Sequence, residues 1–205
     1  MAVWTYTITS HAQSHYSYSG NAQNVYDYLH ALGFTNEACI GIIANMEHES
    51  YINPAQQEIG YGGDTSRGYG LVQWTPASTK ILAYADSVGG NWYDGDLQMN
   101  YLMINAPQSW IKTSNFPYTW EQYKQIDNIY TATRCFFANF ERGTFHNALL
   151  DYADYWSDHI NYAGGTTPPD IPPVQPPPYN PNPDIPLADA INLMFLMSDF
   201  KRKMS

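Results

Sequence analysis

Residues 41–54 read GIIANMEHESYINP, and residues 60–74 read GYGGDTSRGYGLVQW. The first stretch is apolar and then acidic, and Pro54 stops a helix because proline lacks a backbone donor and restricts the residue before it. The second stretch is too rich in glycine for a regular element. The pair predicts a helix that carries Glu47 and Glu49 in its last turns, followed by an irregular loop over residues 58–70.

Helical signals continue on both sides of this stretch, and strand signals are scarce. Apolar residues between positions 22 and 32 follow helical spacing before Gly33, and Thr35 can cap the helix that leads to Glu49. Thr75 is predicted to cap a helix that closes at Gly89. Further helices are predicted over residues 96–105, 131–142 and 144–162. The fold class is therefore mostly α.

Composition divides the chain into four parts. Residues 1–18 form a polar and aromatic N-terminal arm, and residues 19–163 form the helical domain. Ten of the fourteen prolines lie between Pro168 and Pro186, which predicts an extended Pro-rich linker over residues 164–186. Residues 187–205 are predicted to form a C-terminal helix. We expect it to dock on a protein surface; the alternative, a membrane surface, suits it less because its basic residues lie beyond the apolar stretch.

The charge balance excludes some partners. The chain has 205 residues, a net charge of −10 and a pI near 4.7, whereas nucleic-acid binding needs clustered basic residues. The 18 tyrosines suit contact with sugars, because rings stack on sugar faces and hydroxyl groups hydrogen-bond. The N-terminus lacks the features of a signal peptide, and no apolar run is long enough to span a membrane. We therefore expect synthesis in the cytoplasm and delivery by lysis or in a virion.

Metal and thiol chemistry are not expected. Cys39 and Cys135 lie in apolar runs and are predicted to be buried free thiols rather than a disulfide. His11 and His15 have helical spacing, but no third ligand accompanies them. We predict no metal and no cofactor.

The two acids before Pro54 suggest acid catalysis. Glycosidic cleavage needs a carboxylic acid that stays protonated near neutral pH, which burial or a negative neighbour provides. The end of a helix helps, because the dipole's negative end disfavours a carboxylate. Glu47 and Glu49 are separated by about 200° around a helix, so they cannot share a face. The apolar residues of this helix centre between the two acids, so the helical wheel does not indicate which of them is the catalytic acid.

Four ordered motifs resemble the phage tail lysozyme family, within the lysozyme and lytic transglycosylase superfamily. They are the opening helices that end in MEHES, the YINP that follows, GYGLVQWT at residues 68–75, and FFANFERG at residues 136–143. The resemblance covers roughly residues 19–162. It implies that residues 19–163 form a lysozyme-like catalytic domain and that the chain cleaves the glycan strands of peptidoglycan.

The resemblance also implies roles for particular residues. Glu49 would be the catalytic acid, and Ser50 would orient the following loop or that carboxylate. Gln73 would line the cleft beside Glu49. Tyr69 and Trp74 would shape the sugar subsites or stack against the sugar, although core packing is the alternative for both.

A second carboxylate is less clearly indicated. Glu58 and Asp64 both lie in the loop between the motifs, and Asp64, among glycines, is the candidate for positioning a water. Glu141 and Arg142 are predicted to form a structural ion pair at a helix end. The family often has proline after this pair, where this sequence has Gly143.

Three functions remain open at this point. The favoured function is a muramidase that cleaves the β-1,4 bond between MurNAc and GlcNAc, with lytic transglycosylation as the alternative route. A structural tail protein that lost catalysis, or a sugar-binding module without turnover, would keep the same fold. The expected partners are peptidoglycan and, through residues 164–205, other phage tail proteins. We expect a virion-associated protein rather than a free endolysin, because the acidic charge suits delivery by a particle.

Overall fold

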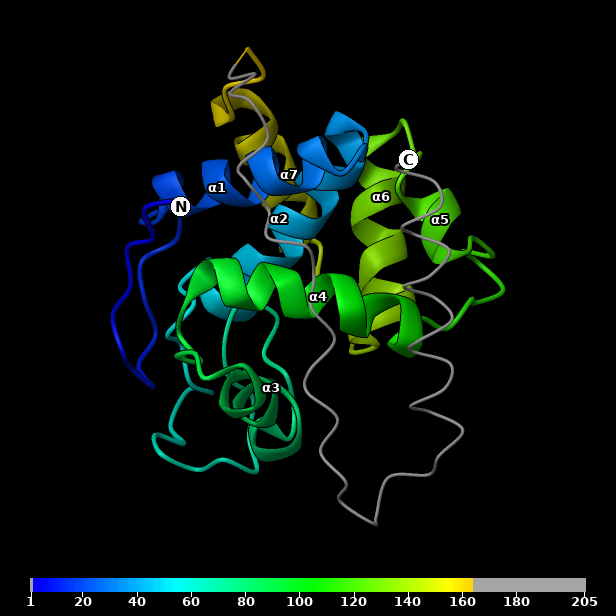
Figure 1. The fold of residues 1–205 in the computed structure, drawn as a ribbon. Helices are drawn as coiled ribbons and strands as arrows, with labels where there is room; N and C mark the ends of the chain where they lie inside the picture. Colours follow the sequence, from blue (N-terminus) through cyan, green and yellow to red (C-terminus); the bar gives the residue numbers. More distant parts are fainter. Residues whose placement is uncertain (1, 164–205) are drawn as a thin grey trace, which may run out of the picture. The chain divides into compact units, whose positions relative to one another are not determined.

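The computed structural model of the chain describes residues 2–163 (Figure 1). Within this range the prediction of a mostly α fold is confirmed, and β pairing is limited to isolated bridges. The predicted linker over residues 164–186 and the predicted C-terminal helix lie outside the described residues. The elements are α1 (Ser19–Ala31), α2 (Asn36–Ser50), the short 3-10 helix η1 (Ala77–Thr79), α3 (Ile81–Val88), α4 (Gly95–Ser109), α5 (Trp120–Tyr123), α6 (Ile129–Phe136), the π-helical η2 (Phe137–Glu141) and α7 (Ala148–His159).

Helix α2 is the central element. Thr35 caps it as predicted, because its side chain accepts a hydrogen bond from the backbone N–H of Ala38. Every residue from Ala38 to Glu47 is buried, and α2 packs against α1, α6 and α7. A helix that is covered on all sides has no single apolar face. This explains why the helical wheel could not separate Glu47 from Glu49.

Helices α2 and α6 approach closely at Gly41. A Cβ atom added there would lie 2.8 Å from the backbone carbon of Ala132 and 2.9 Å from the backbone nitrogen of Thr133. One turn further on, the Asn45 side chain donates hydrogen bonds to the backbone oxygens of Gly41 (2.7 Å) and Thr133 (3.1 Å). The absence of a side chain at Gly41 lets α6 approach α2, and the buried Asn45 amide binds the two helices together. The η2 segment that follows α6 is thereby placed near the end of α2.

We predict that Gly41→Ala lowers the free energy of unfolding by about 1–3 kcal/mol, since the added methyl group meets backbone atoms that must move. Gly20→Ala is the matched control, because a Cβ at that helical position has nothing within 4 Å. Helix propensity alone should make this control neutral or stabilising by up to about 1 kcal/mol. Urea denaturation of both variants measures the contrast, and equal effects would contradict the close approach.

Several predicted helix limits differ from the observed ones. Thr75 caps no helix; its hydroxyl donates to the backbone oxygen of Gln73, and α3 begins only at Ile81. The end of α3 at Gly89, in the left-handed conformation, is as predicted. The predicted helix over residues 131–142 starts earlier, where the Asn128 side chain caps α6, and the predicted helix over residues 144–162 is shorter. Helix α5 was not predicted, because it has only one turn.

Residues 2–18 run largely as an extended arm against the helical domain (Figure 1). The Trp4 indole N–H donates to the Asp96 carboxylate (2.8 Å), and Thr9 pairs with Gln56 through backbone hydrogen bonding. Further along, His15 Nδ1 lies 2.8 Å from Glu47 Oε1. These contacts fasten the arm to α4, to the loop after α2 and to α2 itself.

Candidate active site

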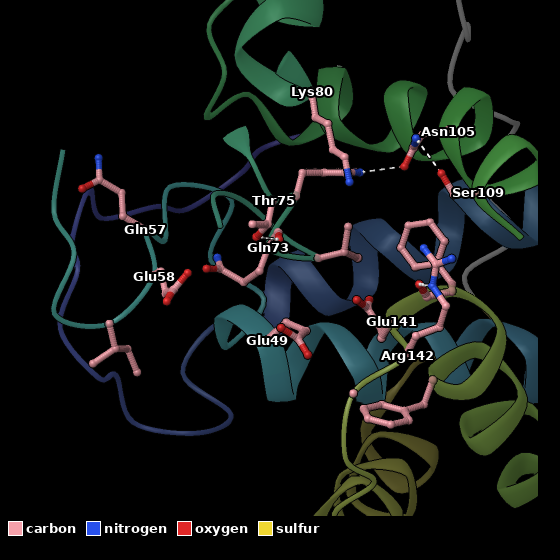
Figure 2. A pocket seen from close by; sticks show the side chains of 16 residues that line it. Glu49, Gln57, Glu58, Gln73, Thr75, Lys80, Asn105, Ser109, Glu141 and Arg142 are labelled. Atoms are coloured by element: carbon pink, nitrogen blue, oxygen red, sulfur yellow. Dashed lines mark hydrogen bonds between the residues drawn. The ribbon is translucent and has the colours of Figure 1, made fainter. Parts of the chain in front are cut away.

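A cleft of about 550 Å³ opens beside the end of α2. Its walls come from α2, the loop that follows it, the second half of α4, and η2 with the residues after it. Figure 2 shows Glu49 at the end of α2, with Glu58 and Gln73 on the loop to one side and Glu141 and Arg142 on the other. The cleft therefore gathers polar side chains from segments that are about 90 residues apart in sequence.

Glu49 lies in the last turn of α2 and is half-buried at the surface of the cleft. Burial, and then the negative charge of Glu58, together raise the pKa of its carboxyl group to about 7. The helix end acts in the same sense, because a negative charge is disfavoured there. Near neutral pH, a large fraction of Glu49 therefore carries a proton that it can donate.

Glu47 lies on the other side of α2 and does not line the cleft. Its side chain is fully buried, and its Oε1 accepts a hydrogen bond from the backbone N–H of Tyr16 (3.0 Å) and contacts His15 Nδ1. Burial raises the pKa of this carboxyl group, while its hydrogen bonds lower it. Glu47 thus anchors the N-terminal arm, and only Glu49 faces the cleft.

Besides Glu49, the carboxyl groups of Glu58 and Glu141 line the cleft, and that of Asp64 does not. Asp64 is exposed and absent from the cleft lining; hydrogen bonds from Ser66 lower its pKa. Glu58 lines the cleft and accepts a hydrogen bond from the backbone N–H of Gly68 (3.2 Å), and Arg67 lies 3.6 Å away. Asp64 as the second carboxylate stays a prediction from the sequence, although its side chain is not part of the cleft lining.

Two of the predicted substrate-contacting residues line the cleft. Gln73 has a positive φ of 48°, and its side-chain amide donates to the backbone oxygens of Gln56 (3.2 Å) and Gly70 (2.9 Å). Trp74 contributes to the lining although it is 3% exposed, and its indole N–H donates to the Asn105 side chain (3.1 Å). Trp74 thus forms part of the cleft wall while packing mainly in the core.

The other two, Tyr69 and Ser50, do not line the cleft. Tyr69 is buried and its ring packs on Trp92, with centroids 5.0 Å apart. The Ser50 hydroxyl is buried and donates to the backbone oxygens of Leu71 (2.8 Å) and Met46 (3.0 Å). Ser50 thus joins the loop to α2, and Tyr69 packs in the core, the alternative left open for it. A role of either residue in contacting the sugar stays a prediction.

Glu141 enters the cleft, and the predicted ion pair with Arg142 is wrong. Within residues 2–163 no ion pair joins the two side chains, and Glu141 Oε1 is buried without a hydrogen-bond partner. Arg142 instead donates from Nε to the backbone oxygen of Phe140 (3.1 Å). Burial, and then the charge of Glu49, raises the pKa of Glu141 well above its ordinary value. The cleft thus holds two neighbouring acids that cannot both ionise readily.

Gln98 holds the loop that carries Glu58 and Gln73 from the side of the core, and the sequence did not predict this role. Its Oε1 accepts from the backbone N–H of Leu71 (2.8 Å), and its Nε2 donates to the backbone oxygens of Pro54 and Trp92 (both 2.6 Å). The side chain is completely buried. The available signal was a glutamine between the apolar residues Leu97 and Met99, a position that favours a buried polar contact.

Cys39 and Cys135 are buried and free, and burial raises the pKa of both thiols. In the part of the chain that the structure describes, no group of three or more His, Cys, Asp or Glu residues is arranged to hold a metal ion. No helix among residues 2–163 is long and apolar enough to cross a membrane.

A helical domain whose central helix delivers a protonated carboxyl group to a polar cleft defines a lysozyme-like protein. The model of the family described as phage tail lysozyme matches residues 20–160, and the chain belongs to this family. It is also similar to morphogenesis protein 1 of Bacillus phage B103, with 34% identity over 150 residues. The match covers 71% of this chain and 40% of that relative, so the chain spans well under half of the relative's length.

Proposed function

We propose that the protein cleaves the glycan strands of peptidoglycan at the β-1,4 bond between MurNAc and GlcNAc, with Glu49 as the general acid. The observation that carries this proposal is the Glu49 carboxyl group, which faces the cleft with a pKa raised to about 7. Membership of the phage tail lysozyme family supports the same activity. The cleft offers the acid that must protonate the leaving oxygen.

Glu58 is the proposed second carboxylate. Its side chain lines the cleft, lies 3.6 Å from the guanidinium of Arg67 and accepts a hydrogen bond from the backbone N–H of Gly68. A charged carboxylate there can stabilise positive charge that develops on the sugar ring, or can activate a water molecule. In the transglycosylase route, a hydroxyl of the substrate replaces that water.

We also propose that the protein acts as part of a phage particle, at the tail. The family description and the name of the B103 relative, a morphogenesis protein, support this location over a free endolysin. A net charge of −10 fits delivery by a particle, because an acidic protein gains no attraction from an anionic wall. The role of residues 164–205 in contacting other tail proteins stays a prediction.

Digestion of purified peptidoglycan by the wild type and by Glu49→Gln tests the activity. Mass spectrometry of the products separates the two routes, since hydrolysis leaves reducing ends and transglycosylation leaves anhydro ends. Either product, lost in the variant, supports the proposal. No cleavage by the wild type on several wall types would favour a structural tail protein, the function that the name of the B103 relative also fits.

We predict that Glu58→Gln shifts the pH profile of cleavage. The charge of Glu58 raises the pKa of Glu49, so its removal should lower that pKa. A general acid works only while protonated, and activity is lost as pH rises through its pKa. The alkaline limb of kcat/KM should therefore move to lower pH. Asp64→Asn removes an exposed acid from the same loop and should leave the limb in place; a shift of equal size would contradict the assignment.

A further inference from the structure

One end of the cleft carries two basic side chains that lack acidic partners. Lys80 follows η1 and is half-buried, and Arg142 follows η2; both line the cleft (Figure 2). Neither forms an ion pair with another residue in the range 2–163, whereas Arg67 and Lys124 do. Burial and then the charge of Arg142 lower the pKa of Lys80, while the charge of Glu141 raises it.

Within residues 2–163, the acids that line the cleft form no ion pair with Lys80 or Arg142. Glu141 lies beside Arg142 in sequence and lines the same cleft, yet no ion pair joins them and Glu141 Oε1 is an unpartnered buried atom. Burial and the neighbouring Glu49 favour its neutral form. Glu58 is engaged by Arg67 at the loop. A local positive charge therefore faces the cleft of a strongly acidic protein.

Arg142 ends η2 with its backbone in the left-handed conformation, which is common at helix C-termini. Its φ is 62°, in the left-handed region that side chains other than glycine seldom adopt, and its N–H donates to the backbone oxygen of Phe137 (2.7 Å). Glycine adopts this conformation most easily, yet the left-handed position is held by Arg142 and not by Gly143, the next residue.

We propose that Lys80 and Arg142 form a subsite for a carboxylate of the muramic-acid residue, and that this subsite selects peptidoglycan over uncharged chitin-type glycan. The carboxylate can belong to the free lactyl group or to the attached peptide stem. This inference rests on the proposed glycan-cleaving function. A guanidinium group binds a carboxylate through a planar pair of hydrogen bonds, and an ammonium group adds a point charge. The subsite also gives an acidic protein a local attraction for an anionic polymer.

The test measures binding separately from cleavage, using the 205-residue chain with Glu49→Gln to prevent turnover. Three glycans of matched length are compared: strands with peptide stems, strands stripped by an amidase to free lactyl carboxylates, and chitin oligosaccharides. Lys80→Met and Arg142→Met should each weaken binding of an anionic glycan by about tenfold, while chitin binding changes less than about twofold. Lys112→Met, an exposed lysine outside the cleft, should have no effect.

Salt provides a second measurement that needs neither basic-residue variant. Raising the ionic strength should weaken binding of the anionic glycans and leave chitin binding nearly unchanged. Preference for stripped strands identifies the lactyl carboxylate as the ligand, and preference for stemmed strands identifies the peptide carboxylate. The subsite is overturned if the parent protein does not prefer anionic glycans, if both variants lose all glycans equally, or if neither loses any.

The outcomes also separate this inference from the proposed function. Cleavage of peptidoglycan by the wild type without charge-dependent binding would overturn the subsite and leave the activity standing. Charge-dependent binding without any cleavage would support the subsite and contradict the activity. No binding of any glycan would overturn the subsite.

Discussion

Replacing Glu49 with glutamine should lower kcat/KM for peptidoglycan by about a thousandfold or more. Glutamine keeps the size of the side chain and its place at the end of α2, but it has no proton to donate to the leaving oxygen. General acid catalysis is commonly worth about 10²–10⁴ in rate. Release of soluble fragments from peptidoglycan, followed at several substrate concentrations, measures the loss. Glu37→Gln, at the other end of the same helix, is the control and should retain activity.

Although Glu49→Gln should lose activity, it should gain stability at alkaline pH. Burial raises the pKa of Glu49 from 4.5 to about 7, so ionising this group costs more in the folded protein than in the unfolded chain. The cost is absent below about pH 4.5 and complete above about pH 7. Glu49→Gln should therefore be more stable than the wild type at pH 8, by on the order of 3 kcal/mol, and similar at pH 4. An inactive variant that is also unstable at pH 8 would point to a structural role for Glu49.

Replacing Gln98 with leucine should produce the largest loss of stability among these variants, about 3 kcal/mol or more. Leucine has a similar volume but leaves the backbone N–H of Leu71 and the backbone oxygens of Pro54 and Trp92 without partners. Each buried polar group left unpaired costs about 1–3 kcal/mol. A Cβ atom added at Gly70, whose φ is +83°, would lie only 2.7 Å from Gln98 Oε1. The loop is therefore fitted to this particular side chain.

Activity should fall with stability, although Gln98 is not among the residues that line the cleft. The loop that it holds carries Glu58 and Gln73, and a displaced loop would misplace both. Gln125→Leu is the matched control, because this exposed glutamine makes a single side-chain hydrogen bond, to Gly33. Urea denaturation and peptidoglycan cleavage should separate the two substitutions. A Gln98→Leu protein with normal stability and cleavage would show that the loop is held by other contacts.

Much of the fold could be predicted because its signals are local. The Thr35 cap and the Gly89 end depend on hydrogen bonds and backbone conformations within one helical turn. The mostly α class follows from apolar spacing over similarly short distances. Membership of the family was predicted from four motifs and is confirmed by the family match over residues 20–160.

The sequence by itself determined the helices, the glycine-rich loop and, through the family resemblance, Glu49 as the expected acid. Only the tertiary structure decided which carboxyl groups share the cleft. Glu47 and Glu49 have the same local signals, but the N-terminal arm covers Glu47. Glu58 lines the cleft and Asp64 does not, and Glu141 reaches the cleft from η2, which follows α6 where α6 packs on α2. Each of these outcomes depends on packing between segments far apart in sequence, which local patterns do not encode.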